Sequence, residues 1–220
     1  MPPNSKGRRK TRATSDEFQA YVEHPRYGRG PRYTGFDPPA KQPFDAHWHS
    51  NKKIRVADTA IEANGSKQHW VIGARSYGFG LSVRYYFDVR RVCQDCNRPF
   101  LFFAEEQRHW YEKLRIPLEV DCIRCHNCRR KHRKHARLRK RFSELLDVSR
   151  PSASELVELV TISLDLIADG EFSAHQKMFD RIRMWLRRLS KFSSIESIRT
   201  ELARRLNDLE SPRREEADGL

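Results

Sequence analysis

The C-terminal part of the chain carries apolar residues with the spacing of amphipathic helices. Three segments between residues 150 and 210 repeat an apolar residue every three or four positions, and short polar connections separate them. Pro151 and Ser152 open the first segment, and Asp169 and Gly170 end it. The three apolar stripes are Leu156, Leu159, Val160, Leu164 and Ile167; Met178, Ile182, Trp185, Leu189 and Phe192; and Ile195, Ile198, Leu202, Leu206 and Leu209. Such stripes bury one face of each helix, so they predict a helical hairpin or three-helix region.

The middle of the chain switches to β-branched and aromatic residues. Residues 81–89 predict a strand, and residues 100–103 predict the returning strand of a hairpin. Asn97 lies in the turn between them, where a left-handed backbone is needed, and asparagine tolerates that conformation well for a residue with a side chain. Residues 104–114 then predict a helix whose apolar face holds Trp110, Tyr111 and Leu114.

Five cysteines lie in and after this hairpin, and the 220 residues contain no other cysteine. Each Cys-x-x-Cys step places two sulfurs on one tight turn, and two such turns can surround a zinc ion as a tetrahedron. The clustering and the odd number of cysteines argue against a disulfide framework. Four thiolates leave zinc no open coordination position, so the predicted site is structural and not catalytic.

Two choices of four cysteines agree with the spacing. Cys93 and Cys96 belong to both, and the second pair is either Cys125 with Cys128 or Cys122 with Cys125. We favour Cys125 with Cys128, because these two lie at the start of a predicted helix, whose N-terminus stabilises thiolates. A hairpin turn combined with a helix start is the treble-clef arrangement of a zinc site, and it leaves Cys122 as a buried thiol.

The positive charge of the chain is concentrated in its first two thirds. The net charge is +14, of which residues 81–149 contribute +8 and residues 150–220 contribute −1. Residues 129–141 hold nine Lys and Arg residues and no acid, on the helix predicted to leave the second cysteine pair. These candidate nucleic-acid-binding residues are Arg129, Arg130, Lys131, Arg133, Lys134, Arg137, Arg139, Lys140 and Arg141. Such an excess of positive charge favours polyanions such as RNA or DNA.

The residues around the cysteines form a recognisable series of motifs. Residues 85–132 contain a Tyr-Phe-Asp-Val run, the first Cys-x-x-Cys, a Phe-rich strand, a Glu-Gln-x-x-Trp-Tyr-Glu helix and a closing Arg-Cys-x-x-Cys-Arg. In these motifs and their spacing the chain resembles the bacterial probable zinc-ribbon (treble-clef) domain family, whose members are largely uncharacterised. The resemblance implies zinc at Cys93, Cys96, Cys125 and Cys128, with Asn97 in place of the usual glycine. It implies no reaction and no partner.

Together these patterns predict an α+β protein. A small treble-clef zinc domain, made of a β-hairpin and helices, is followed by an α-helical region and preceded by a largely irregular segment. The predicted divisions are a disordered basic tail (1–20), an irregular aromatic, Gly- and Pro-rich segment with short strands such as 69–72 (21–80), the zinc domain (81–148), the helical region (150–210) and a flexible tail (211–220). The chain has no apolar run of about 18 residues and no secretory leader, which predicts a cytoplasmic protein that does not bind membranes.

Three functions are compatible with these features. The favoured one is a non-catalytic zinc-binding protein whose structural four-cysteine site presents a basic helix to the backbone of RNA or DNA. The alternative is an adaptor that binds another protein through its C-terminal helices, for which the stripe in residues 178–192 is the motivation. A metal-dependent nuclease of the His-Asn-His type is less favoured, because the histidines on the basic helix are expected to lack a carboxylate partner. The histidines available for it are His109, His126, His132 and His135.

Overall fold

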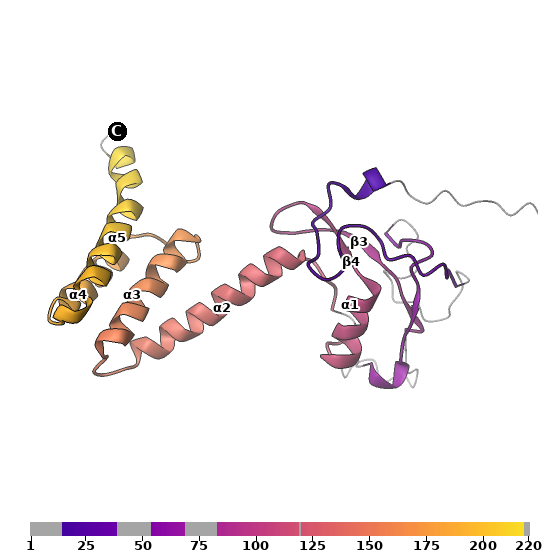
Figure 1. The fold of residues 1–220 in the computed structure, drawn as a ribbon, viewed down its shortest axis with the longest axis horizontal. Helices are drawn as coiled ribbons and strands as arrows, with labels where there is room; N and C mark the ends of the chain where they lie inside the picture. The colour runs from indigo at the N-terminus through magenta and orange to yellow at the C-terminus, as the bar shows by residue number, and fades with distance from the viewer. Residues whose placement is uncertain (1–14, 39–53, 69–82, 119, 218–220) are drawn as a thin grey trace, which may run out of the picture. The chain divides into compact units, whose positions relative to one another are not determined.

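The computed structural model describes residues 15–38, 54–68, 83–118 and 120–217 (Figure 1). The chain divides into two compact units, Met1–Arg129 and Arg130–Leu220, which are described separately below as unit 1 and unit 2. The α+β class predicted from the sequence is confirmed. The strand predicted over residues 69–72 lies outside the described residues, and the predicted domain divisions stay predictions. No helix in the described part of the chain is both long and apolar enough to cross a membrane.

The described residues of unit 1 form two small antiparallel pairs of strands. The strands are β1 (Ile61–Glu62), β2 (Tyr85–Tyr86), β3 (Val89–Val92) and β4 (Pro99–Phe102). β1 pairs with β2, and β3 pairs with β4 in a register that places Val89 opposite Phe102. The single strand predicted over residues 81–89 is therefore wrong in this part, because the chain changes its pairing partner at Phe87 and Asp88. Asp88 is fully buried, and its backbone N–H donates to the hydroxyl of Thr59. This side-chain hydrogen bond takes the place of the strand-to-strand hydrogen bond that a continuous strand would make here.

The helix predicted over residues 104–114 is present, but it changes its winding halfway. α1 (Ala104–Arg108) continues as a π-helix, η4 (His109–Lys113), in which the backbone N–H of Leu114 donates to the carbonyl of His109. The wider turn changes the direction of the residues that follow it. Leu114 is consequently 56% exposed and does not belong to the apolar face predicted for it, whereas Tyr111 is fully buried.

The core of unit 1 surrounds the hairpin formed by β3 and β4. Tyr86, Phe102 and Tyr111 pack together with the buried cysteines. The segment from residue 15 to residue 38 lies against this core, as the backbone hydrogen bond from Val22 to Pro99 shows. The segment begins with a short 3-10 turn, η1 (Ser15–Phe18), and another such turn, η2 (Gly65–Lys67), follows β1.

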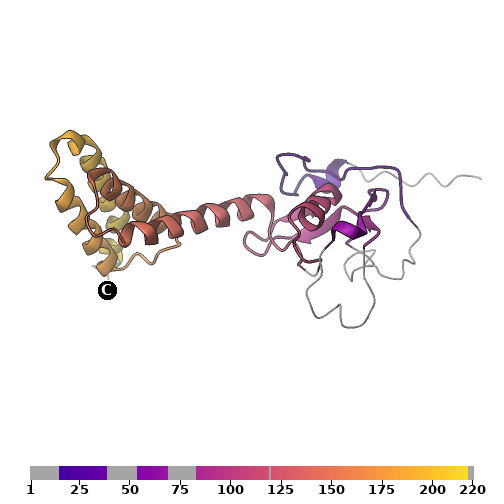
Figure 2. The ribbon, with the colours of Figure 1, turned by 90° about the horizontal axis from the view of Figure 1, so that it is seen from below.

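Unit 2 is helical, as predicted. α2 (His126–Leu146) begins in unit 1 and continues into unit 2, where α3 (Ala153–Ala168), α4 (Gln176–Leu189), η5 (Ser193–Ile195) and α5 (Glu196–Ala217) follow (Figure 1 and Figure 2). Ser152 caps α3 in a reciprocal arrangement with Glu155, and Gly170 ends the turn after α3 with a positive φ of 74°. The helix α5 extends to Ala217, past residue 210, where the helical region was predicted to end.

The predicted apolar stripes form the core of unit 2. Leu164, Ile182 and Leu189 are completely buried, and Leu206 of α5 packs against them. Phe142 and Leu145 add one face of α2 to the same core. Two members of the stripes are exposed instead: Phe192 is 39% accessible and Ile198 is 45% accessible.

Candidate metal centre

Four cysteines of unit 1 come together at the tip of the hairpin and the start of α2. The Sγ atoms of Cys93, Cys96, Cys125 and Cys128 all lie within 4.8 Å of one another, and those of Cys96 and Cys125 are 3.9 Å apart. Four sulfurs bound to one zinc ion at about 2.3 Å in a tetrahedron are separated by about 3.8 Å. The spacing and the chemistry of this donor set therefore fit a tetrahedral metal ion bound by thiolates.

The first pair of cysteines is held by the turn between β3 and β4. The backbone N–H of Cys93 donates to the carbonyl of Arg98, and the backbone N–H of Asn97 donates to the carbonyl of Cys93, both over 3.0 Å. Asn97 has a φ of 53°, which is the left-handed conformation predicted for it. The turn thus directs both sulfurs toward the same point.

The second pair lies at the beginning of α2. The backbone N–H of Arg129 donates to the carbonyl of Cys125, so that Cys125 directly precedes the first turn and Cys128 lies in it. Two contacts join this segment to the hairpin turn. The backbone N–H of Gln94 donates to the carbonyl of Ile123, and the Arg124 guanidinium lies 2.9 Å from the Asp95 carboxylate.

The four sulfurs do not ionise with equal ease. Burial alone would raise the pKa of Cys93, but backbone N–H groups of Cys125, Cys96 and Asp95 lower it to about 6. Burial and the neighbouring sulfurs raise the pKa of Cys125 and Cys128. The expected stabilisation by the helix N-terminus is thus outweighed at these two residues, chiefly by burial and also by the nearby sulfurs, whose thiolates repel one another. A bound cation offsets that repulsion, so the cluster is suited to hold a metal ion.

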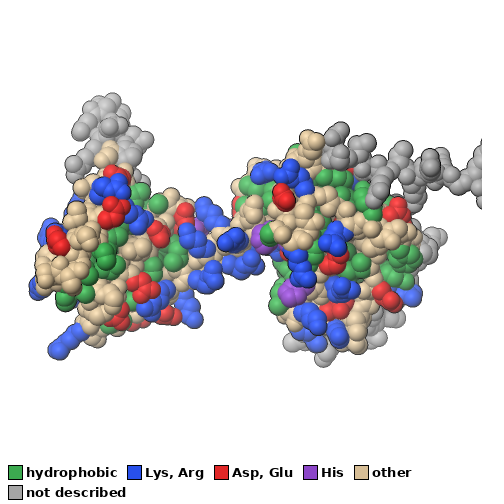
Figure 3. Space-filling model, in the orientation of Figure 1, with side chains coloured by type: hydrophobic (Ala, Val, Ile, Leu, Met, Phe, Trp, Pro, Cys, Tyr) green, Lys and Arg blue, Asp and Glu red, His purple; other side chains and the backbone are tan. Residues whose placement is uncertain are grey.

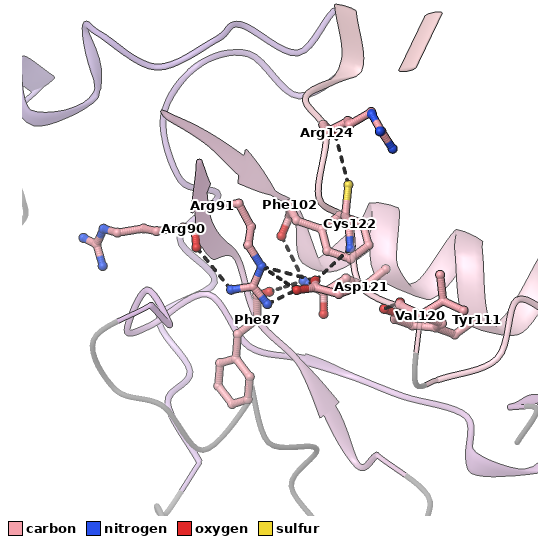
Figure 4. A network of polar contacts seen from close by, with 10 residues as sticks. Phe87, Arg90, Arg91, Phe102, Tyr111, Val120, Asp121, Cys122 and Arg124 are labelled. Atoms are coloured by element: carbon pink, nitrogen blue, oxygen red, sulfur yellow. Dashed lines mark hydrogen bonds and ion pairs between the residues drawn. The ribbon is translucent and has the colours of Figure 1, made fainter. Parts of the chain in front are cut away.

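Cys122 lies outside the cluster, in a network of polar contacts (Figure 4). Its backbone N–H donates to Asp121, whose carboxylate also binds the Arg91 guanidinium through two hydrogen bonds. Its thiol is 3.4 Å from the carbonyl of Arg124, and burial raises its pKa to about 12. Cys122 therefore remains a protonated thiol whose surroundings position the segment before α2.

A second network, which the sequence did not indicate, lies where α2 begins. The Arg129 guanidinium is 2.6 Å from the Glu106 carboxylate, and both side chains are largely buried. The same guanidinium lies over the ring of Trp110, 4.9 Å from its centre. His24, from the N-terminal segment, approaches Glu106 at 3.7 Å. No spacing rule could have found these partners, because they come from three distant parts of the chain.

The nine candidate nucleic-acid-binding residues fall into two groups. Five of them form ion pairs: Arg129 with Glu106, Lys134 with Asp169, Arg139 with Glu171, Lys140 with Glu144, and Arg141 with Glu158 and Glu144. The other four are exposed and have no ion pair among the described residues; they are Arg130, Lys131, Arg133 and Arg137. The basic segment is therefore partly neutralised, by the nearby Glu144 and by four acids that are remote in the sequence.

His135 is the main exception to the expectations for α2. It is only 1% exposed; its Nε2 lies 2.8 Å from Asp169 and its Nδ1 lies 2.7 Å from Glu171. The expectation that the histidines of this helix lack a carboxylate partner is wrong for His135, because the loop after α3 brings two acids to it. Both ring nitrogens can donate at once only in the doubly protonated imidazole. With both nitrogens occupied, His135 joins α2 to that loop.

The apolar stripe over residues 178–192 is largely used inside unit 2. Ile182, Trp185 and Leu189 are buried in its core. Met178 is partly buried against the same core, and Phe192 is 39% exposed. Most of the surface that motivated an adaptor function is therefore already covered by the chain itself.

The comparisons with known proteins agree with this geometry. Residues 87–137 match the model of a family described as a probable treble clef domain. This range contains the hairpin, α1, all five cysteines and the first part of α2. No curated protein and no solved structure matches the chain. The chain thus contains a treble clef domain with a four-cysteine cluster in a metal-binding arrangement.

Proposed function

We propose that this protein is a non-catalytic nucleic-acid-binding protein, in which a zinc ion in the treble clef domain holds the start of α2. Zinc is the ion that best suits four cysteine ligands in tetrahedral geometry. With all four positions filled by sulfur, the ion has no place for a substrate or a reactive water. Its contribution is then structural, and binding depends on the side chains of α2.

The observation that supports this proposal is a row of arginines on one side of α2 that form no ion pair with any described residue. At about 100° per residue, Arg130, Arg133 and Arg137 fall within an arc of about 60°, and each is at least about 120° from His135 and Phe142, which are buried. Figure 3 shows Lys and Arg side chains along this helix. Arginines in this arrangement can contact successive phosphates without reading bases, so the binding is expected to be largely independent of nucleic-acid sequence.

The test is a measurement of affinity at several salt concentrations. Zinc-loaded full-length protein is titrated into a labelled duplex of mixed sequence, between about 50 and 200 mM salt, and binding is followed by fluorescence anisotropy. Replacement of Arg130, Arg133 and Arg137 by glutamine is expected to reduce the slope of log K against log salt by about 3, because each lost phosphate contact removes about 0.9.

A matched variant controls for the loss of three charges. Arg181, Arg187 and Arg188 are exposed on α4 and have no ion pair in the part of the chain described. Their replacement by glutamine removes the same charge and should leave the slope nearly unchanged. Absence of binding at low salt, or equal losses in both triple variants, would refute the proposal.

A further inference from the structure

Unit 1 contains an open groove of about 550 Å³ that is separate from the cysteine cluster. One wall comes from the N-terminal segment, with Arg26, Tyr27 and Arg32. The other wall comes from α1 and the π-helix, with Arg108 and Lys113 among its residues. A volume of this size lies in the range of pockets that bind small organic ligands.

The two walls are held together by buried and partly buried contacts. The Asp88 carboxylate accepts hydrogen bonds from the backbone N–H of Arg32 (2.7 Å) and from that of Ala104, the first residue of α1 (2.8 Å). The Arg32 guanidinium also lies 3.0 Å from the Glu105 carboxylate. Because Asp88 is fully buried, these contacts fix the spacing of the walls before any ligand arrives.

The groove has more positive than negative charge, and each of its two acids has one partner. Glu105 binds Arg32 through one carboxylate oxygen, while its other oxygen is buried without a hydrogen-bond partner among the described residues, and Glu112 accepts a hydrogen bond from the backbone N–H of Asn64. Arg26, Arg108 and Lys113 are exposed and have no ion pair among the described residues. Three cations that converge on one concave surface without acidic partners form a site for an anion.

The backbone of the second wall supports the same interpretation. The π-helix His109–Lys113 forms part of the groove, and such wide turns occur frequently at functional sites. In Figure 3, Lys, Arg and His side chains gather over α1, with acidic side chains between them. The ring of Tyr27 adds an aromatic surface beside the cations, with Arg26 at 5.5 Å and Arg32 at 5.7 Å from its centre.

We propose that this groove binds the phosphate group of a nucleotide, through Arg26, Arg108 and Lys113. The phosphate is either that of a free nucleoside monophosphate or that of one nucleotide within an RNA strand, since both present the same charged oxygens. The site lies in unit 1 and shares no residue with the cation row on α2. Its variants can therefore be tested separately from those of the function proposed above.

The experiment compares two charge-matched variants of the full-length, zinc-loaded protein by isothermal titration calorimetry. The groove variant replaces Arg26 and Arg108 by glutamine. The control variant replaces Arg84 and Arg115 by glutamine; both are exposed in unit 1 but do not line the groove. The probes are inorganic phosphate, adenosine monophosphate and a short single-stranded RNA, and the zinc content of each variant is checked first.

The groove variant is expected to bind the phosphate probe at least about tenfold more weakly than the natural protein, because each charged hydrogen bond to phosphate contributes about that factor to the affinity. The control variant is expected to change the affinity by less than about twofold. If adenosine monophosphate binds in this way, the ligand is a free nucleotide. If only the RNA does so, the groove accepts a phosphodiester within a strand. The proposal is overturned if no probe binds below about 10 mM, or if both variants weaken binding equally. Replacement of Arg130, Arg133 and Arg137 leaves binding of adenosine monophosphate unchanged, so failure of the groove and failure of the cation row are distinguished.

Discussion

Replacement of Arg129 by methionine is expected to destabilise unit 1, although the sequence assigns this residue to nucleic-acid binding. The Arg129 side chain is 13% exposed and that of its partner Glu106 is 9% exposed. Methionine keeps an apolar stem beside Trp110 but leaves the carboxylate buried without its main partner. Breaking a buried ion pair in this way costs about 3–5 kcal/mol. Because His24 remains 3.7 Å from Glu106, we expect a value near the lower limit, about 3 kcal/mol.

The loss of stability in the Arg129→Met variant should depend on pH. Burial alone would raise the pKa of Glu106, but the imidazole of His24, 3.7 Å away, and the ion pair with Arg129 lower it below its usual value. A carboxyl group whose pKa is lower in the folded state stabilises the fold above its unfolded pKa of about 4.3, and that stabilisation is lost as the pH falls through the folded pKa. The Arg129→Met variant should therefore differ most from the natural protein near neutral pH, and the difference should shrink in acid.

Hydrogen exchange followed peptide by peptide is the suitable assay, because it reports the opening of unit 1 separately from that of unit 2. Arg130→Met is the control, since Arg130 is the next residue, is exposed and has no ion pair among the described residues. It should change the opening free energy by less than about 0.5 kcal/mol. The reasoning is refuted if Arg129→Met leaves protection in α1 and β4 unchanged but reduces the salt dependence of nucleic-acid binding as Arg130→Met does.

Three further predictions concern single sites. Cys128→Ser should abolish stoichiometric zinc binding, measured by elemental analysis. Cys122→Ala should retain one zinc per chain, and its free energy of unfolding in chemical denaturation should fall by only about 1–2 kcal/mol. Loss of zinc from the Cys122→Ala variant would show that Cys122 is a ligand. Asp88→Asn should lower thermal stability by about 1–3 kcal/mol, because an amide cannot accept hydrogen bonds at both of its terminal atoms; unchanged melting would contradict the role of its two backbone contacts. His135→Phe should lower the melting temperature of unit 2 at neutral pH, because hydrogen bonds from His135 lower the pKa of both Asp169 and Glu171 and so stabilise the fold. This stabilisation is lost in acid, so the difference in melting temperature between the variant and the natural protein should narrow below about pH 4. A constant difference between neutral pH and acid would contradict the prediction.

The features that could be predicted from the sequence are those that depend on neighbouring residues. The helices of unit 2 follow from apolar spacing, and their ends follow from Ser152 and Gly170. The hairpin turn follows from the first cysteine pair and from Asn97, whose left-handed backbone the structure contains. Periodicity, capping and turn chemistry act over a few residues, so one chain is enough to reveal them.

The features that only the tertiary structure decided depend on contacts between distant residues. The sequence presents nine equivalent cations in residues 129–141, yet the fold pairs four of them with acids that are remote in the sequence and leaves another four without an ion pair to any described residue. It likewise surrounds Asp88 with backbone donors from two remote segments, and so builds the groove beside α1. The interaction energy of a charged side chain depends on its distance to other charges and on its burial, and both are set only when the chain folds. Each Cys-x-x-Cys turn is therefore a local feature of this sequence, whereas the meeting of the two turns in one cluster and the surface available to a partner are properties of the fold.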